Sequence, residues 1–560
     1  MSGADAADAT VLDAARAWLA QDPDDATRAE LTALIDAAAA GDATASADLA
    51  DRFGARLQFG TAGLRGRLGA GSNRMNRVLV AQAAAGFAAY LREKSPSGDA
   101  PLVVIGYDGR RNSDVFARDS AELFAGAGLR AILLPRMLPT PVLAFAVRHL
   151  DAAAGVMVTA SHNPPDDNGY KVYLGGEDAG SQIVAPADTE IAVHIDRIAT
   201  TTPVPELPRG EYEIADEAVV QAYVAATAAV APATAGAAGM SWVYTAMHGV
   251  GSETLHAILE LAGYPLPTVV EAQIAPDGRF PTVAFPNPEE PGAMDLSFET
   301  ARASDAEFII ANDPDADRLA VALPDPSAEG GWRRLTGNEI GLLLGWRAAA
   351  RAAERGETGS LACSLVSSPG LQAVAEHYGL GFHATLTGFK WISRAPGILY
   401  GFEEALGYLV NPETVRDKDG ISAAVAILGM IAEARERGMG LADLLRQFEE
   451  TFGFFASGQV SLRVDDVSVI SRIMATLRAT TPAEVGGVAV TRVDDLSTGA
   501  DGFPPSDVLR LWLDDGSRLI VRPSGTEPKL KAYLDVRGES ADDAAQRLAA
   551  LDAGTRALLL

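Results

Sequence analysis

Short apolar runs of strand length alternate with helical stretches along most of this 560-residue chain. The run PLVVIGYDG (101–109) ends in a turn, an amphipathic stretch capped by Ser113 follows, and LRAILLP (129–135) resumes a strand. The same alternation recurs around GMSWVYTAMHG (239–249), AEFIIANDPDADRLAVAL (306–323) and GSLACSLVSS (359–368). Such alternation predicts α/β units with largely parallel sheets.

Three breaks divide the chain into segments of domain size. TTTPVPELPRG (200–210) is a Pro-rich linker, PDPSAEGG (324–331) is a polar gap rich in turn residues, and the pattern changes character at ETFGFFASG (450–458). The first 50 residues have helical spacing, and the segment after the last break is rich in strands. At roughly 100–200 residues per domain, the length predicts about three to five domains.

The acidic balance excludes some classes of function. The chain has 46 Lys+Arg against 74 Asp+Glu, a formal net charge of −28, and is therefore a poor non-specific ligand for nucleic acid or an anionic membrane. No apolar run reaches the roughly 20 residues that span a bilayer, and the N-terminus lacks a signal-peptide pattern. The single cysteine, Cys363, cannot form an internal disulfide, which is typical of a reducing compartment. We therefore expect a cytoplasmic protein that binds neither nucleic acid nor membrane, and the sequence does not predict its oligomeric state.

The segment VMVTASHNPPDDNGYKVYL (156–174) places a serine in a stiff turn between two strands. Pro164 and Pro165 restrict the backbone after Ser161, and Lys171 lies on the following strand. A serine held in this way can act as a nucleophile or carry a phosphate. An ordinary turn is the alternative interpretation, and the absence of G-x-S-x-G argues against a serine hydrolase.

Alternating aspartates follow a strand in FIIANDPDADRLAVAL (308–323). Asp313, Asp315 and Asp317 offer three hard oxygen ligands, which suit Mg²⁺. An EF-hand would need Gly and Glu where this loop has Arg318 and Pro324, so that interpretation fails. A solvated acidic turn remains as the alternative.

Donors for an anion gather in SRLIVRPSGTEPKLKAYLDV (517–536). Arginine, hydroxyls, glycine N–H groups and lysines together make a set suited to a phosphate, although a plain hairpin is the alternative. Two weaker segments are LQFGTAGLRGRLG (57–69), with Arg65 in a glycine-rich turn, and LYGFEEALGYLV (399–410), with two glutamates after a strand. TLTGFKWI, with Lys390, and RDKDGI, with Lys418, are similarly ambiguous.

Taken in order, these segments resemble the α-D-phosphohexomutases, which include phosphoglucomutases and phosphomannomutases. TASHNPPDDNGYK resembles the family's phosphoserine loop, DPDADR its metal loop, GFEEALG its sugar loop and RPSGTEP its phosphate loop. The resemblance implies three consecutive α/β domains, with mixed sheets and helices on both faces, and a C-terminal α+β domain around a central cleft. The expected domains are a phosphoserine domain with its helical lead-in (1–205), a metal-binding domain (206–325), a sugar-binding domain (326–452) and a phosphate-binding domain (453–560).

The resemblance also implies roles for single residues. Ser161 would carry the phosphoryl group with His162 beside it, and Lys171 would be the candidate proton shuttle. Arg65 and Arg318 would lie next to the transferring phosphoryl group. Mg²⁺ would be held by an oxygen on Ser161 and by the three loop carboxylates, Asp313, Asp315 and Asp317.

A second set of residues would hold the rest of the substrate. Glu403 and Lys390 would meet the sugar. The non-transferring phosphate would be held by the donors of the last motif, namely Arg522, Ser524, Gly525, Thr526 and Lys529. The charges agree with this assignment, because three aspartates, Mg²⁺ and phosphoserine sum to about −3 and need converging cations before they accept an anionic substrate.

The resemblance implies an isomerase that moves a phosphoryl group between C1 and C6 of a hexose phosphate through phosphoserine and a sugar 1,6-bisphosphate. Glucose phosphates are favoured, and mannose phosphates are also candidates. Many family members have Ser two positions after the first sugar-loop glutamate, whereas this chain has Ala405. That version, with TGFKWI and GTAGLRG, looks like the branch that includes phosphopentomutase-like enzymes, so C1/C5 transfer on a pentose phosphate is the alternative.

Other classes of function remain open at this point. A bisphosphate synthase or phosphatase would use the same phosphoserine and would release its phosphate to water or to another acceptor. A non-catalytic phosphosugar-binding protein would keep its function without the Ser161 hydroxyl. A serine hydrolase is disfavoured, because His162 directly follows Ser161, where a base cannot easily face it.

Overall fold

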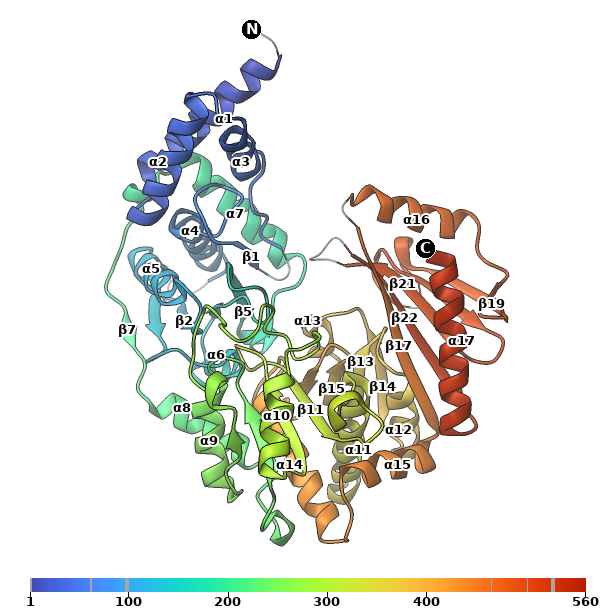
Figure 1. Ribbon diagram of the computed structural model, residues 1–560. Helices are drawn as coiled ribbons and strands as arrows, with labels where there is room; N and C mark the ends of the chain where they lie inside the picture. Colours follow the sequence, from blue (N-terminus) through green and yellow to red (C-terminus); the bar gives the residue numbers. More distant parts are fainter. Residues whose placement is uncertain are drawn as a thin grey trace. The chain divides into compact units, whose positions relative to one another are not determined.

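The computed structural model describes residues 3–60, 63–95, 100–464, 466–500, 502–524 and 529–559 (Figure 1). The chain forms two compact units. Unit 1 comprises Met1–Arg334 and Gly407–Glu433, and unit 2 comprises Leu335–Leu406 and Ala434–Leu560. No helix of the described residues is long and apolar enough to cross a membrane.

Unit 1 begins with three helices, α1 (Gly3–Gln21), α2 (Asp25–Ala39) and α3 (Ala43–Phe53). Asp24 and Asp42 cap the second and third helices by accepting backbone N–H bonds from their first turns. Trp18, Leu31 and Leu49 bury the shared apolar side of these helices in the same core as the first sheet.

The first sheet of unit 1 is mixed and has the strand order β1-β5-β4-β2-β3-β7, with β6 paired to β5. β2, β3, β4 and β7 run parallel, whereas β5 is antiparallel to β4 and to β1. The strands are β1 (Leu64–Arg67), β2 (Leu102–Tyr107), β3 (Arg130–Leu133), β4 (Ala154–Val158), β5 (Asp167–Leu174), β6 (Ser181–Gln182) and β7 (Glu213–Ile214). The helices of this part are α4 (Arg77–Lys94), α5 (Ser113–Gly126), α6 (Thr140–His149) and α7 (Ala187–Thr201).

The two faces of this sheet are covered by different helices because successive side chains of a strand point to opposite sides. Val103 and Ile105 of β2 pack with α4 and α5 in the main core of unit 1. Gly106 and Gly155 lie against Leu143 of α6, which packs on the other face.

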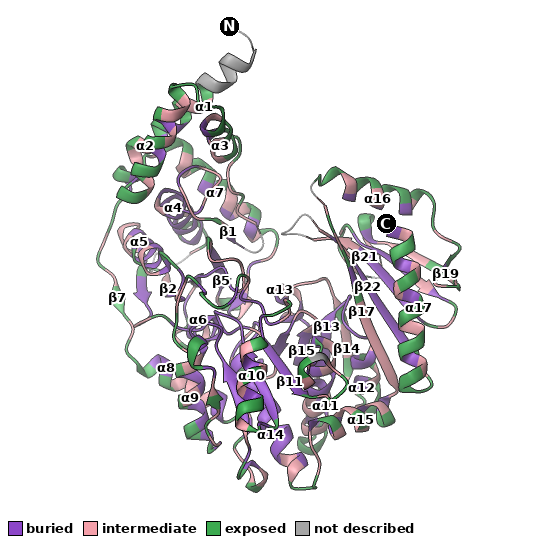
Figure 2. Ribbon diagram, viewed as in Figure 1, coloured by how far each residue is buried: buried purple, intermediate pink, exposed green. Residues whose placement is uncertain are grey.

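The second sheet of unit 1 has the order β12-β11-β10-β8-β9. β8, β9 and β10 are parallel, and β11 returns antiparallel beside β10. The strands are β8 (Trp242–Thr245), β9 (Thr268–Val269), β10 (Phe308–Asn312), β11 (Leu319–Pro324) and β12 (Trp332–Arg334). Every residue of β8 and β10 is buried, which explains their continuous apolar runs. Figure 2 shows the same burial along the neighbouring strand β11, except at its last residue. The accompanying helices are α8 (Ala218–Ala228), α9 (Gly251–Ala262), α10 (Asp295–Ser304) and α14 (Gly420–Arg435).

Unit 2 contains a parallel group of strands with the order β14-β13-β15. These strands are β13 (Ser360–Ser364), β14 (Gly381–Thr385) and β15 (Ile398–Glu403). Helices α11 and α12 pack against this group. The helices of this part are α11 (Gly337–Arg355), α12 (Gly370–Tyr378), α13 (Phe389–Ile392) and α15 (Leu441–Phe452).

The last part of unit 2 is an antiparallel sheet with the order β17-β22-β21-β20-β19-β18. Helix α17 packs on β17 and β22 (Figure 1). The elements are β17 (Phe454–Arg463), α16 (Ser468–Ala479), β18 (Glu484–Val485), β19 (Val488–Asp495), β20 (Leu509–Leu513), β21 (Arg518–Pro523), β22 (Lys529–Gly538) and α17 (Ala541–Leu559). Three mixed or parallel α/β sheets followed by this α+β part confirm the expected fold class.

Two details differ from the sequence interpretation or refine it. Ser113 is not the cap of α5, because the preceding residue, Asn112, is the N-cap and the Ser113 hydroxyl donates to Asp108. Strand β16 (Gly407–Leu409) and most of α14 belong to compact unit 1, although they fall inside the segment expected to bind sugar. The four expected domain boundaries therefore stay a prediction.

Candidate functional site

Ser161 lies in the loop between β4 and β5 of unit 1, with 3% of its surface exposed. Its Oγ donates to Asp313 Oδ2 over 2.7 Å and lies 3.1 Å from His162 Nδ1. Its backbone φ is 51°, in the left-handed region that a residue with a side chain seldom adopts. The loop therefore holds this hydroxyl in one direction, toward the aspartates, rather than leaving it as an ordinary flexible turn.

The three aspartates lie in the tight loop that joins the antiparallel strands β10 and β11. Their side chains are at most 1% exposed, and one oxygen from each lies within 4.8 Å of the others. Asp313 Oδ1 accepts the backbone N–H of Arg318, and Asp315 Oδ2 accepts the Thr140 hydroxyl over 2.7 Å. The solvated acidic turn is thereby excluded, because the carboxylates point into the protein.

The oxygens left over in this loop are suited to a divalent cation. Asp315 Oδ1 and Asp317 Oδ1 are buried and have no hydrogen-bond partner among the described residues. Burial and the neighbouring charges of Asp315 and Asp317 raise the pKa of Asp313 well above its ordinary value. Unpaired buried carboxylate oxygens are costly, and hard oxygen ligands of this kind bind Mg²⁺. The aspartate loop therefore fits a metal ion.

Two lysines face the same carboxylates. Lys171 Nζ donates to Asp315 Oδ2 over 2.7 Å and to Asp317 Oδ2 over 2.8 Å, and Lys418 Nζ lies 3.2 Å from Asp317 Oδ2. Burial lowers the pKa of Lys171, but the charges of Asp315 and Asp317 outweigh burial and hold the pKa above its ordinary value. Burial also raises the pKa of Asp317, but the Lys171 and Lys418 charges outweigh it and hold the pKa below its ordinary range. Lys171 is therefore an ammonium ion beside the aspartate loop, and the Lys418 side chain contacts the same Asp317 oxygen.

The remaining residues expected near the phosphoryl group also lie in this part of unit 1. Arg65 Nη1 donates to Asn163 Oδ1 over 3.1 Å in the serine loop. Arg318 lies 3.7 Å from Glu289, measured from Nη1 to Oε2. Burial, reinforced by the charges of Arg318 and Arg65, lowers the pKa of His162 well below its ordinary value, so the ring beside Ser161 is neutral.

Three residues at this site were missed or left ambiguous by the sequence interpretation. Thr140, at the start of α6, binds the metal loop with both its hydroxyl and its backbone N–H. Lys418 lies in the ambiguous RDKDGI segment. Arg110, just after β2, donates to the carbonyls of the serine loop. The sequence interpretation did not single out Arg110, although the Gly- and charge-rich run GYDGRRN (106–112) is a signal that could have found it, and no local pattern marks Thr140.

The residues expected to bind sugar and the second phosphate lie in unit 2. Glu403 ends β15, and its neighbour Glu404 accepts hydrogen bonds from Ser364 and Ser367, each over 3.0 Å. Burial and the Glu404 charge raise the pKa of Tyr533, while Arg522 lowers it, so that this phenol lies near both the sugar-loop and phosphate-loop residues.

The described parts of the phosphate motif form the mouth of the β21–β22 hairpin. Arg522 pairs with Lys531 in the strand register, and the Ser524 N–H donates to the Lys529 carbonyl over 2.8 Å. Gly525 and Thr526 lie outside the described residues. Lys390 lies in the short helix α13, its ammonium 6.0 Å from the Trp391 ring centre.

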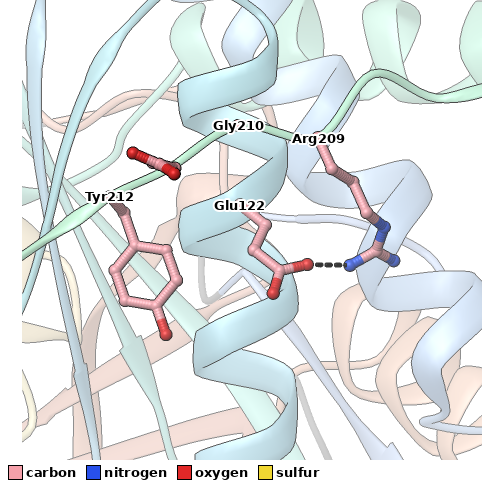
Figure 3. Close-up of a pocket in the computed structure, with 5 residues that line it drawn as sticks. Glu122, Arg209, Gly210 and Tyr212 are labelled. Atoms are coloured by element: carbon pink, nitrogen blue, oxygen red, sulfur yellow. Dashed lines mark hydrogen bonds and ion pairs between the residues drawn. The ribbon is translucent and has the colours of Figure 1, made fainter.

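A separate hollow on unit 1 shares no lining residue with the serine site. It has a volume of about 490 Å³ and is lined by Glu122, Arg209, Gly210, Glu211 and Tyr212. Figure 3 shows that Arg209 and Glu122 are paired with each other across it. Glu122 and Arg209 thus neutralise each other, and the hollow is open to solvent, so it does not resemble a catalytic pocket.

Comparison with known proteins matches the whole arrangement. Four domain families match the chain, in this order: Phosphoglucomutase/phosphomannomutase, alpha/beta/alpha domain I over residues 56–202, alpha/beta/alpha domain II over 221–327, alpha/beta/alpha domain III over 336–452, and the C-terminal domain over 470–552.

Individual relatives extend over nearly the same span. The chain is 54% identical over 489 residues to a probable phosphomannomutase of Haemophilus influenzae, which covers 87% of this chain and 98% of that protein. It is 34% identical over 533 residues to phosphopentomutase of Homo sapiens, at 86% and 85% coverage. A phosphoglucomutase/phosphomannomutase family protein from Burkholderia thailandensis shares the fold, with a TM-score of 0.69, 20% identity and coverage of 90% and 97%. The chain therefore belongs to the phosphoglucomutase/phosphomannomutase family of isomerases.

Proposed function

We propose that the protein is a Mg²⁺-dependent phosphosugar mutase that interconverts the 1- and 6-phosphates of a hexose by way of phosphorylated Ser161. The observation that carries this proposal is the 2.7 Å hydrogen bond from Ser161 Oγ to Asp313, in a loop whose two other aspartates each keep a buried oxygen with no hydrogen-bond partner among the described residues. A hydroxyl in this position can carry a phosphoryl group next to a cation. Glucose and mannose phosphates are both candidate substrates.

In this proposal the bond from phosphorus to Ser161 Oγ breaks as a bond forms from phosphorus to the free hydroxyl of the sugar monophosphate. Lys171 donates a proton to the departing Oγ and receives the proton of the sugar hydroxyl, so charge is conserved. The Lys171 ammonium is fixed by Asp315 and Asp317, which places its proton at a defined position. Phosphoryl transfer relies on positioning and charge stabilisation, which this set of groups supplies.

Mg²⁺ would be held by Asp313, Asp315, Asp317 and an oxygen on Ser161, where it would neutralise charge on the transferring group. Arg65 would neighbour that group from β1, and Arg318 from the metal loop. His162, neutral and next to Ser161 Oγ, would accept or donate a hydrogen bond but would not add charge.

Unit 2 would bind the part of the substrate that does not react. Glu403 and Lys390 would contact the sugar hydroxyls. The hairpin mouth with Arg522, Ser524 and Lys529, together with Gly525 and Thr526, would bind the non-transferring phosphate. A sugar 1,6-bisphosphate would form once per cycle and would reorient in the site before its other phosphoryl group is transferred back to Ser161. A trace of the bisphosphate would act as the activator, because it would phosphorylate Ser161 in protein that lacks the phosphoryl group.

The test is a panel of sugar 1-phosphates followed by phosphorus NMR with the full-length protein, Mg²⁺ and a trace of the matching bisphosphate. We expect the 6-phosphate to appear in the wild type and to disappear with EDTA or with Ser161→Ala, which should lower the rate at least 10³-fold. Ser297→Ala is the matched control, since Ser297 is equally buried, its hydroxyl has no hydrogen-bond partner among the described residues, and it lies outside the site. No isomerisation of any sugar phosphate by the wild type would refute the proposal, and stoichiometric release of free phosphate would favour a phosphatase.

A second candidate is C1/C5 transfer on a pentose phosphate. It is favoured by the 34% identity to the human phosphopentomutase and by Ala405 at a position where many family members have a serine. The same panel decides between the two, because kcat/KM for ribose 1-phosphate would exceed that for the hexose phosphates if the pentose is the substrate.

A further inference from the structure

Arg110 lies inside the loop that carries Ser161. Its Nη1 donates to the carbonyls of Pro164 and Asp167 over 2.8 and 3.0 Å. Its Nη2 donates to the carbonyl of Ser161 over 2.6 Å and also to the carbonyl of Asn163. One guanidinium group therefore binds four carbonyl oxygens within the seven-residue segment 161–167, which spans the serine loop and the first residue of β5.

The guanidinium is itself fixed from its other sides. Arg110 is 4% exposed, and its Nε lies 3.7 Å from Asp108 Oδ2. The face of the guanidinium lies 4.9 Å from the ring centre of Phe280. Asp108 is held in turn by the Arg110 N–H and the Ser113 hydroxyl. The cation has little freedom to move, so the loop bound to it is also held in place.

This arrangement bears on the strained serine. Ser161 has a φ of 51°, a conformation that a residue with a side chain adopts only when the surroundings enforce it. The Thr159 hydroxyl accepts the Ser161 N–H over 2.8 Å, and Arg110 binds the Ser161 carbonyl. The two peptide groups that flank the Ser161 side chain are therefore both tied to the protein.

We propose that Arg110 is the positioning residue that fixes Ser161 Oγ at the metal loop, and that the planar guanidinium is required for this role. The proposal rests on the mutase function proposed above and adds the residue that keeps the phosphoryl carrier in its reactive direction. Lysine carries the same charge but has a single nitrogen, which cannot reach four carbonyls arranged around two guanidinium nitrogens. Misplacing a reacting atom by about 1 Å can lower a rate about 100-fold.

Arg111 provides a matched control. It is the neighbouring residue, it carries the same side chain, and it contacts the same loop through Asp166 at 2.7 Å. Its side chain is 51% exposed and, among the described residues, donates to no carbonyl of this loop. Removing Arg111 tests the loss of one positive charge at this loop without loss of the carbonyl contacts.

The experiment compares Arg110→Lys, Phe280→Leu and Arg111→Met in the full chain. We measure kcat and KM for isomerisation, the rate at which glucose 1,6-bisphosphate phosphorylates Ser161 (followed by intact-protein mass spectrometry) and the melting temperature. Arg110→Lys should lower kcat and the phosphorylation rate at least 100-fold with KM within threefold. Phe280→Leu should lower both rates about tenfold, and Arg111→Met should leave both within twofold.

A folded Arg110→Lys protein with kcat and phosphorylation rate within threefold of the wild type would overturn the proposal. If Arg110→Lys does not fold, Phe280→Leu decides, because unchanged rates in that variant would equally overturn it. A purely structural role would lower the melting temperature without separating kcat from KM, and that result also counts against positioning. A wild type that becomes phosphorylated on Ser161 but isomerises no sugar phosphate would refute the proposed function while the phosphorylation rates still test Arg110.

Discussion

Asp419 is a buried carboxylate at the start of α14, and replacing it by asparagine should stabilise unit 1 near neutral pH. Its Oδ1 accepts the N–H groups of Ile421 and Ser422 over 3.0 and 2.9 Å, and both of its oxygens lie 3.0 Å from the Tyr223 hydroxyl. Asparagine can accept the same helix N–H bonds through its carbonyl oxygen. The substitution therefore removes the charge and keeps the cap.

The magnitude follows from the pKa of this group. Burial raises the pKa of Asp419 from 3.8 to about 6, despite the N–H and hydroxyl donors that lower it. Because the folded pKa lies above the unfolded one, the stabilising contribution is fully present below pH 3.8 and is lost as pH rises through about 6. A difference of about two pKa units, at about 1.4 kcal/mol each, lowers the free energy of unfolding of the wild type by about 3 kcal/mol as pH rises. The Asp419→Asn variant has no such loss, because asparagine does not titrate.

The assay is thermal unfolding of the wild type and Asp419→Asn between pH 4 and pH 7.5. With an unfolding entropy of about 2.1 cal/mol/K per residue over the roughly 360 residues of unit 1, 3 kcal/mol corresponds to about 4 °C. The difference in melting temperature, variant minus wild type, should therefore grow by up to about 4 °C as pH rises across this range.

Asp277→Asn is the control within the same unit. The side-chain and backbone donors of Arg279 lower the pKa of Asp277 to about 2, so its contribution is present above pH 3.8 and is lost as pH falls. Across pH 4 to 7.5 the difference for Asp277→Asn should therefore stay nearly constant, because Asp277 is ionised in both the folded and the unfolded state over almost all of this range. A difference for Asp419→Asn that stays constant or shrinks between pH 4 and pH 7.5 would refute the reasoning.

Two further substitutions test the contacts that hold the aspartate loop and the sugar loop in place. A Cβ added at Gly420 would lie 2.2 Å from the Arg318 carbonyl, so Gly420→Ala should displace the aspartate loop and lower kcat at least tenfold. Gly440→Ala is the control and should not lower kcat, because a Cβ added there meets no atom within 4 Å. Equal rates for both variants would contradict this prediction. Glu404→Ala removes the acceptor of two serine hydroxyls beside the sugar loop, at a cost of about 1–3 kcal/mol per unsatisfied group, and should raise KM several-fold more than it lowers kcat in steady-state assays. An unchanged KM would show that this carboxylate does not order the sugar loop.

Much of the fold could be predicted because its strands are short, apolar and bounded by turn residues. The run at 308–312 is a central strand buried along its length, which the apolar sequence pattern expresses directly. That most of α14 belongs to unit 1 could not be predicted in this way. Its first residue, Gly420, packs against the Arg318 carbonyl of the metal loop, about 100 residues earlier in the chain, and no local pattern specifies a contact between such distant segments.

The residues of the candidate site fall into the same two groups, those that lie in a local motif and those that only the folded sheet brings together. The serine loop, the aspartate loop and Lys171 are continuous motifs, so their residue types could be read before their positions were known. Arg110 and Thr140 follow other strands, and the parallel alignment of β2 and β4 is what brings the first of them under the serine loop. Sequence periodicity gives the existence of strands, but their neighbours depend on packing of the whole sheet.

Lys418 shows why residues that only folding brings together matter for the chemistry of the site. The aspartate loop alone would hold three negative charges in a buried space, and its own neighbour Arg318 is directed partly to Glu289. Lys171 lies on β5, earlier in the sequence than the aspartate loop, and Lys418 lies just before α14, later in the sequence. Their Nζ atoms contact the Oδ2 atoms of Asp315 and Asp317. Both lysines bind the same side of the carboxylates, so the Oδ1 atoms stay without hydrogen bonds among the described residues. The folded protein thus neutralises part of the charge while leaving Asp315 Oδ1 and Asp317 Oδ1 without a hydrogen bond among the described residues, which is what the proposed function requires of a site for a divalent ion and an anionic phosphoryl group.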